Sequence, residues 1–157
     1  MANVKPIPEG HTTITATITV NDGAKAIEFY KKAFGATEKG RALGPDGKLM
    51  HAEIQIGTSR LMLNDEVMGN RSPQSYGGSP VAFYLYFENA EAALQKAVAA
   101  GGKQLMPVTD MFWGDRMGQF QDPFGYRWNV ATHVKDLTQE QMKKGQEEFM
   151  KQMAGAR

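Results

Sequence analysis

The sequence predicts an α+β fold of two tandem modules, each ordered strand, helix, strand, strand, strand. The first observation is an internal repeat. A constant offset of sixty-seven positions aligns Asp22 with Asn89 and Gly35 with Gly102, and repeats of this kind change the fold class expected from a sequence. The second is that short segments after each helix alternate apolar and polar residues with the period of two typical of strands.

The first module is predicted to span 13–66, after an irregular arm at 1–12 that is rich in Pro and Gly. Thr13 to Val20 alternates Thr with Ile, Ala and Val, which predicts a half-buried strand. Asp22 offers a helix cap, and helical spacing of apolar residues follows until Gly35, where a left-handed residue is expected. Further strands are predicted at 36–42, 48–56 and 60–64.

Segment 48–56 is predicted to have one apolar and one polar face, because alternate side chains leave opposite sides of a strand. The two faces are Met50, Ala52, Ile54 and Ile56 against Leu49, His51, Glu53 and Gln55.

A polar linker at 67–79 precedes the second module, predicted to span 80–134. Asn89 caps its helix, which runs through Ala100, and Asp122 opens a Pro-containing turn before the last strand. The strands are predicted at 80–87, 103–112, 115–121 and 126–131. The tail at 135–157 is predicted to be a helix with Thr138 as its cap, docked on the surface or exchanged with a partner chain.

Composition excludes several partners. The net charge of +1 gives no electrostatic case for nucleic acid or a membrane surface. No apolar run approaches the ~20 residues of a membrane span, and the first residues lack the apolar core of a signal peptide. The absence of cysteine removes thiolate nucleophiles and Cys-ligated metals. These features predict a cytoplasmic location.

Three stretches carry a family resemblance: GHTTITATITVNDGAKAIEFYKKAFGA, MHAEIQIGTSRLMLNDE and FWGDRMGQFQDPFGYRWNVATH. In this order they resemble the PhnB-like branch of the vicinal oxygen chelate superfamily, which contains glyoxalase I, bleomycin and fosfomycin resistance proteins and extradiol dioxygenases. The resemblance covers about 10–135 as one such domain. It implies a curved eight-stranded sheet around a cavity, and it implies a homodimer.

In metal-dependent members of that superfamily, four side chains from four strands hold one divalent ion. Here the matching positions carry Thr15, Met62 (with Asn64 as the alternative), Ala82 and Asn129. None is a good ligand for a divalent cation, which prefers imidazole and carboxylate groups. The sequence therefore predicts no cofactor, and a divalent metal at a non-standard site is the open alternative.

The resemblance also implies which side chains line the cavity. They mix hydroxyls, amides, arginines and aromatic rings, and would suit a small amphipathic ligand with an anionic or carbonyl group. The predicted ligand-binding residues are Thr15, Thr17, Arg60, Met62, Tyr84, Tyr86, Trp113, Arg116, Arg127 and Asn129.

Two clusters leave alternatives open. His51 and Glu53 share a strand face and are either an acid/base pair or metal-site fragment, or hydrogen-bonded polar residues on a wet sheet; the second is favoured. Trp113 and Arg116 either stack on and pair with an anionic ligand, or form a surface cover in which Arg116 pairs with Asp115. His11 and His133 are not favoured, and catalytic residues are left unknown.

The leading hypothesis is a metal-independent binding protein, like the bleomycin-resistance members, with a small-molecule ligand. The alternative is a lyase, isomerase or dioxygenase whose metal is held by residues such as His51 and Glu53. A structural or partner-binding role is supported only by the charged tail. Nothing resembles a methyl-donor site, because no glycine-rich loop follows an apolar strand.

Overall fold

The computed structural model describes residues 4–155, so the ends of the predicted arm and tail, 1–3 and 156–157, lie outside it. The elements follow the predicted repeat, with one short helix added in the linker. The first module contains β1 (Ala16–Val20), α1 (Gly23–Phe34), β2 (Thr37–Leu43), β3 (Leu49–Ile56) and β4 (Ser59–Asp65). The remainder contains α2 (Pro73–Tyr76), β5 (Ala82–Tyr86), α3 (Ala90–Ala99), β6 (Lys103–Asp110), β7 (Asp115–Gln121), β8 (Arg127–His133) and α4 (Gln139–Gly155).

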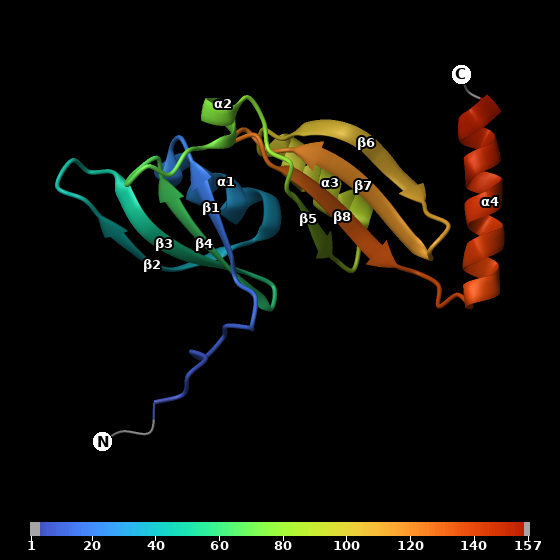
Figure 1. Ribbon diagram of the computed structural model, residues 1–157, viewed down its shortest axis with the longest axis horizontal. Helices are drawn as coiled ribbons and strands as arrows, with labels where there is room; N and C mark the ends of the chain where they lie inside the picture. Colours follow the sequence, from blue (N-terminus) through green and yellow to red (C-terminus); the bar gives the residue numbers. More distant parts are fainter. Residues whose placement is uncertain (1–3, 156–157) are drawn as a thin grey trace.

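The strands form two four-stranded mixed sheets with the same topology. Their orders are β1-β4-β3-β2 and β5-β8-β7-β6. The first strand of each module pairs in parallel with the last, and the other pairs are antiparallel. The α+β fold of two βαβββ modules is therefore confirmed. The strands lie in two separate sheets that do not close, rather than in one continuous eight-stranded sheet (Figure 1).

The two modules share one hydrophobic core, because α1 and α3 pack against each other between the sheets. The Phe34 ring of α1 lies 4.9 Å from that of Trp128 on β8, and Trp128 is 1% exposed. A buried hydrogen bond of 2.8 Å from the Tyr30 hydroxyl to Asp122 also joins the modules. Trp128 therefore belongs to the hydrophobic core.

The predicted helix signals are confirmed. Asp22 accepts a hydrogen bond from the backbone N–H of Lys25, and Asn89 accepts one from that of Ala92. Gly35 ends α1 with φ of 67°, a left-handed conformation that glycine adopts without a steric cost. The repeat therefore extends to the capping groups of the two helices.

One element was not predicted, and one local prediction is wrong. The linker contains α2, which Ser72 caps and which Gly77 ends in a left-handed conformation; Pro73 suits its first turn. Strand β3 also departs from alternation at its start. Leu49 is 2% exposed and Met50 37%, because the pairing of β2 with β3 shifts register there, and a bulge turns side chains to the other face.

The tail forms a helix capped by Thr138, whose hydroxyl accepts a hydrogen bond from the N–H of Gln141. Helix α4 has no buried residue and stands apart from the sheets (Figure 1). It touches the second module where the rings of Phe149 and Phe112 lie 5.7 Å apart. Within residues 4–155, no helix is long and apolar enough to cross a membrane.

Candidate functional site

Each sheet has one face packed on the helices and one open face that carries most of the predicted ligand-binding residues. The strand register places Thr17 of β1 beside Met62 of β4, and their side chains are 3.7 Å apart. On the second sheet, Tyr84 of β5 is beside Asn129 of β8. Asn129 is held by a hydrogen bond of 2.8 Å from Gln119.

The positions that the resemblance assigns to the family's metal carry poor metal donors. Thr15, Met62 and Asn129 offer a neutral hydroxyl, a thioether and an amide, and Ala82 offers no donor. Asn64, the alternative, is 6% exposed, and its amide is engaged by Thr19 and a backbone carbonyl. These residues do not fit a divalent cation. Among residues 4–155, no group of three or more His, Cys, Asp or Glu side chains is placed to hold a metal ion.

A groove of about 480 Å³ between the sheets brings Arg60 together with Tyr84 and Tyr86. We call it the inter-sheet groove. Its walls are the start of β1, the turn at 57–58, and residues 83–87 along the edge of β5. That edge has no neighbouring strand in the sheet, so backbone polar groups as well as aromatic rings border the groove.

Arg60 is held in place by Glu53 of β3. Its guanidinium donates to one carboxylate oxygen of Glu53 at 2.5 Å, and the other oxygen is 2.9 Å from Nε2 of His11. All three side chains are largely buried, at 15%, 18% and 14% exposure. The histidine that contacts Glu53 is thus His11 of the N-terminal arm, whereas His51 is exposed on the same sheet face.

A second polar cluster surrounds Asp115 at the start of β7, which is 2% exposed. One oxygen accepts hydrogen bonds from Tyr84 at 2.8 Å, Tyr86 at 3.1 Å and Trp113 at 3.0 Å. The other is 2.8 Å from Nδ1 of His133 at the end of β8. Two predicted ligand-binding tyrosines and Trp113 are therefore fixed by a single buried carboxylate.

The hydrogen bonds and burial of this cluster shift the pKa values of its members. Burial acts to raise the pKa of Asp115, but hydrogen bonds from His133 and the tyrosines bring it below its usual value. The hydrogen bond to Asp115 raises the pKa of His133 most, and the hydrogen bond to Asp136 raises it further. Burial, with the contact to Asp115, raises the pKa of Tyr84 to about 12. At neutral pH the Asp115 carboxylate is therefore ionised, and the hydroxyls of Tyr84 and Tyr86 are protonated.

Arg116 lies away from this cluster. Its guanidinium pairs with Glu91 of α3 and is 3.6 Å from Asp110, so it belongs to the helix side of the sheet. The alternative pairing of Arg116 with Asp115 does not occur. The neighbouring Gly114 does meet the backbone closely, because a β-carbon there would collide with the carbonyl oxygen of Lys135. Arg127 is exposed on β8.

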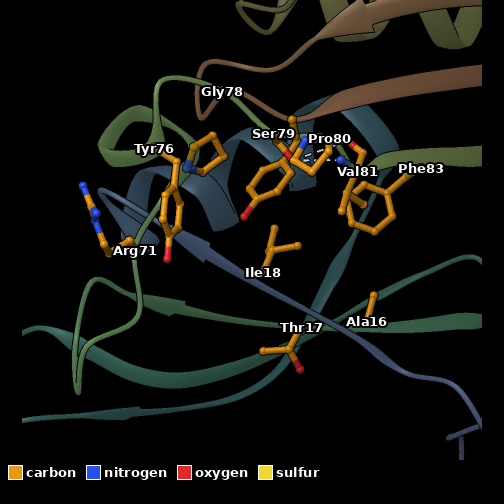
Figure 2. Close-up of a pocket in the computed structure, with 12 residues that line it drawn as sticks. Ala16, Thr17, Ile18, Arg71, Tyr76, Gly78, Ser79, Pro80, Val81 and Phe83 are labelled. Carbon is orange, nitrogen blue, oxygen red and sulfur yellow. Dashed lines mark hydrogen bonds between the residues drawn. The ribbon is translucent and has the colours of Figure 1, made fainter.

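A further groove, of about 600 Å³, lies between β1 and the linker, and we call it the linker groove (Figure 2). Arg71 lies over the ring of Tyr76, 4.6 Å from its centroid. Of the predicted ligand-binding residues, Thr17 alone lines this groove among the residues described. Four of the predicted residues therefore lie in the inter-sheet groove or the Asp115 cluster: Arg60, Tyr84, Tyr86 and Trp113. The structure does not bring the other six to these two places: Thr15, Thr17, Met62, Arg116, Arg127 and Asn129.

Sequence reasoning missed three members of these clusters: His11, Asp115 and His133. His11 lies in the arm, where no periodicity predicts a contact with Glu53 forty-two positions away. Asp115 and His133 face each other across β7 and β8. The one available signal for that contact was the predicted pairing of the two strands on either side of the turn at Asp122, which brings the start of the first strand opposite the end of the second.

Comparison with known proteins gives consistent matches. The sequence model of the Glyoxalase/Bleomycin resistance protein/Dioxygenase superfamily matches residues 10–130. An uncharacterized protein of Mycobacterium tuberculosis is 40% identical over 145 residues, covering 89% of this chain and 82% of the relative. An uncharacterized protein of Arabidopsis thaliana is 33% identical over 123 residues, covering 73% and 74%.

Solved structures agree in fold. An X-ray structure of an Arabidopsis thaliana gene product has a TM-score of 0.62 and 31% identity, covering 76% of this chain and 98% of its own. The PhnB protein from Bacillus cereus has a TM-score of 0.59 and 18% identity, covering 77% and 99%. The predicted resemblance to the superfamily is confirmed by the sequence model, and the PhnB protein shares the fold.

Proposed function

Because the chain belongs to the Glyoxalase/Bleomycin resistance protein/Dioxygenase superfamily, we propose that it binds a small amphipathic molecule in the inter-sheet groove. The ligand carries an aromatic or apolar body and an anionic or carbonyl group. Binding uses no divalent metal at the four family positions. The observation that carries the proposal is the meeting of Arg60 with Tyr84 and Tyr86 in one groove.

The size and lining of the groove support this ligand class. Its volume of about 480 Å³ lies within the range of small-molecule sites. The rings of Tyr84 and Tyr86 are 5.2 Å apart and supply an aromatic wall with hydroxyls held by Asp115. Preorganised side chains lower the entropic cost of binding.

Arg60 supplies the positive charge. Its Nη1 is paired with Glu53, while its buried Nε has no hydrogen-bond partner in the described structure. A buried donor without a partner is costly, so a ligand oxygen that reached it would gain a charge-assisted hydrogen bond. The side chains at Thr58 and Ser59 add hydroxyls to the same wall.

The test uses 8-anilinonaphthalene-1-sulfonate, a flat, amphipathic anion, titrated into the folded protein by calorimetry. We expect one site, and Arg60→Gln should weaken it about tenfold or more, since a charged hydrogen bond contributes about 1.5–3 kcal/mol. Arg71→Gln, in the linker groove, is the matched control and should leave the affinity unchanged. Thermal unfolding of both variants verifies that they are folded.

Equal loss in both arginine variants, or loss in Arg71→Gln alone, would contradict the proposal for this groove.

We also propose that the chain forms a homodimer. Support comes from apolar side chains left exposed in the single chain, among them Met150 and Met153 of α4, at 60% and 58% exposure. Burying such residues against a second copy is favourable. Light scattering coupled to size exclusion should give a mass twice the 17.3 kDa of the chain; a monomer at micromolar concentration would refute it.

A further inference from the structure

The contacts of Asp115 fix which nitrogen of His133 carries a proton. One carboxylate oxygen faces Nδ1 of His133, and the other accepts three hydrogen bonds from Tyr84, Tyr86 and Trp113. An ionised carboxylate can only accept. Nδ1 must therefore hold a hydrogen, and in the neutral ring the lone pair is on Nε2.

We propose that Asp115 and His133 form a proton-transfer centre on the open face of the second sheet, with Nε2 of His133 as the proton acceptor. Asp115 is the positioning residue. A buried carboxylate on one ring nitrogen, with the other directed outward, orients imidazole as a general base. This activity goes beyond ligand binding and does not depend on Arg60.

Asp136 controls the resting state of this centre. Its carboxylate is 3.0 Å from Nε2 of His133, and its side chain is fully exposed. A carboxylate can bond Nε2 only when that nitrogen is protonated. Loss of the proton therefore releases Asp136 and frees Nε2. The titratable groups that face the ring, directly or through the shared carboxylate, are Asp115, Asp136, Tyr84 and Tyr86.

The surface around His133 indicates the substrate class. Tyr86 is 63% exposed, and the Nε1 of Trp113 lies 3.4 Å from the hydroxyl of Tyr84. His133 itself is half exposed. Aromatic rings next to an accessible base suit a flat carbon acid, a compound whose C–H is acidified by a neighbouring carbonyl or heteroaromatic ring.

The probe for this activity is 5-nitrobenzisoxazole. A base removes its ring C–H proton, the released electron pair forms the nitrile as the N–O bond breaks, and the oxygen leaves as the phenolate. The proton on Nε2 then passes to water, so no co-reactant is consumed. We expect catalysis above the buffer rate, and a loss of at least tenfold in His133→Ala. His51→Ala, an exposed histidine on the first sheet, should retain full activity.

Asp136→Asn is the informative surface variant, because its side chain is outside the packed structure. It should move the rising limb of the pH–rate profile to lower pH and increase the rate at neutral pH. Full activity in His133→Ala, or an unchanged profile in Asp136→Asn, would overturn the proposal.

Nuclear magnetic resonance supplies a readout that needs no substrate. Long-range ¹H–¹⁵N spectra should assign the neutral ring of His133 to the Nδ1–H form, and Asp115→Asn should change this assignment. A neutral His133 with its hydrogen on Nε2 would also overturn the proposal. Arg71→Gln, in the linker groove, should leave both the rate and the tautomer unchanged. The tautomer is read without any ligand, which separates this test from that of the inter-sheet groove.

Discussion

The hydrogen bond between Tyr30 and Asp122 predicts a measurable link between the modules. Tyr30 is fully buried on α1 and donates to Asp122 at 2.8 Å. Tyr30→Phe removes the hydroxyl and leaves the ring, which packs 5.4 Å from that of Trp128. The change therefore removes one hydrogen bond without opening a large cavity.

The expected cost follows from what remains at Asp122. Trp128 and the backbone N–H groups of Phe124 and Tyr126 still donate to this carboxylate, so it is not left without partners. Hydrogen bonds to charged groups contribute about 1.5–3 kcal/mol. We expect Tyr30→Phe to lower the free energy of unfolding by about 2 kcal/mol.

Tyr126→Phe is the matched control, because its hydroxyl donates to the neutral carbonyl of Thr19 at 3.0 Å. A neutral hydrogen bond contributes about 1 kcal/mol. Urea unfolding, followed by the fluorescence of the buried Trp128, gives both values with an unchanged dependence on denaturant. A Tyr30→Phe cost no larger than that of Tyr126→Phe would refute the reasoning.

Three further predictions concern the two clusters. Gly114→Ala combines a positive φ of 97° with a backbone collision, so urea unfolding should report a loss of about 2–3 kcal/mol; a loss below about 1 would contradict it. Glu53→Gln should weaken the hold on His11, and proteases should then cleave the N-terminal arm faster than in the wild type. The raised pKa of His133 stabilises the fold below its ordinary value of about 6.5. That contribution should disappear as pH rises through the folded-state pKa, and Asp136→Asn should reduce it.

Local signals in the sequence were sufficient for the fold. The repeat from Asp22 to Asn89, the left-handed Gly35 and the turn at Asp122 each depend on neighbouring residues. Capping and turn preferences act over a few positions, so a single sequence contains them. The burial of Leu49 was not predicted, because a bulge depends on how the strand pairs with its partner strand.

The candidate site depended on contacts that neighbouring residues do not determine. The family resemblance, combined with alternation along the strands, gave the open faces and with them Arg60 and Tyr84. It could not predict that His11 folds back on Glu53, nor that one buried Asp115 accepts hydrogen bonds from β5, from the loop before β7 and from β8. Such contacts are set by strand pairing and by packing of the arm, which act across tens of residues.

The most direct test of the binding account is to map the bound probe on the protein. Backbone amide chemical shifts should be recorded as 8-anilinonaphthalene-1-sulfonate is titrated into the ¹⁵N-labelled chain. The account predicts that the largest changes fall at residues 57–61 and 83–87, the walls of the inter-sheet groove. Changes centred instead on the linker groove at Arg71 and Tyr76, or on α4, would contradict it.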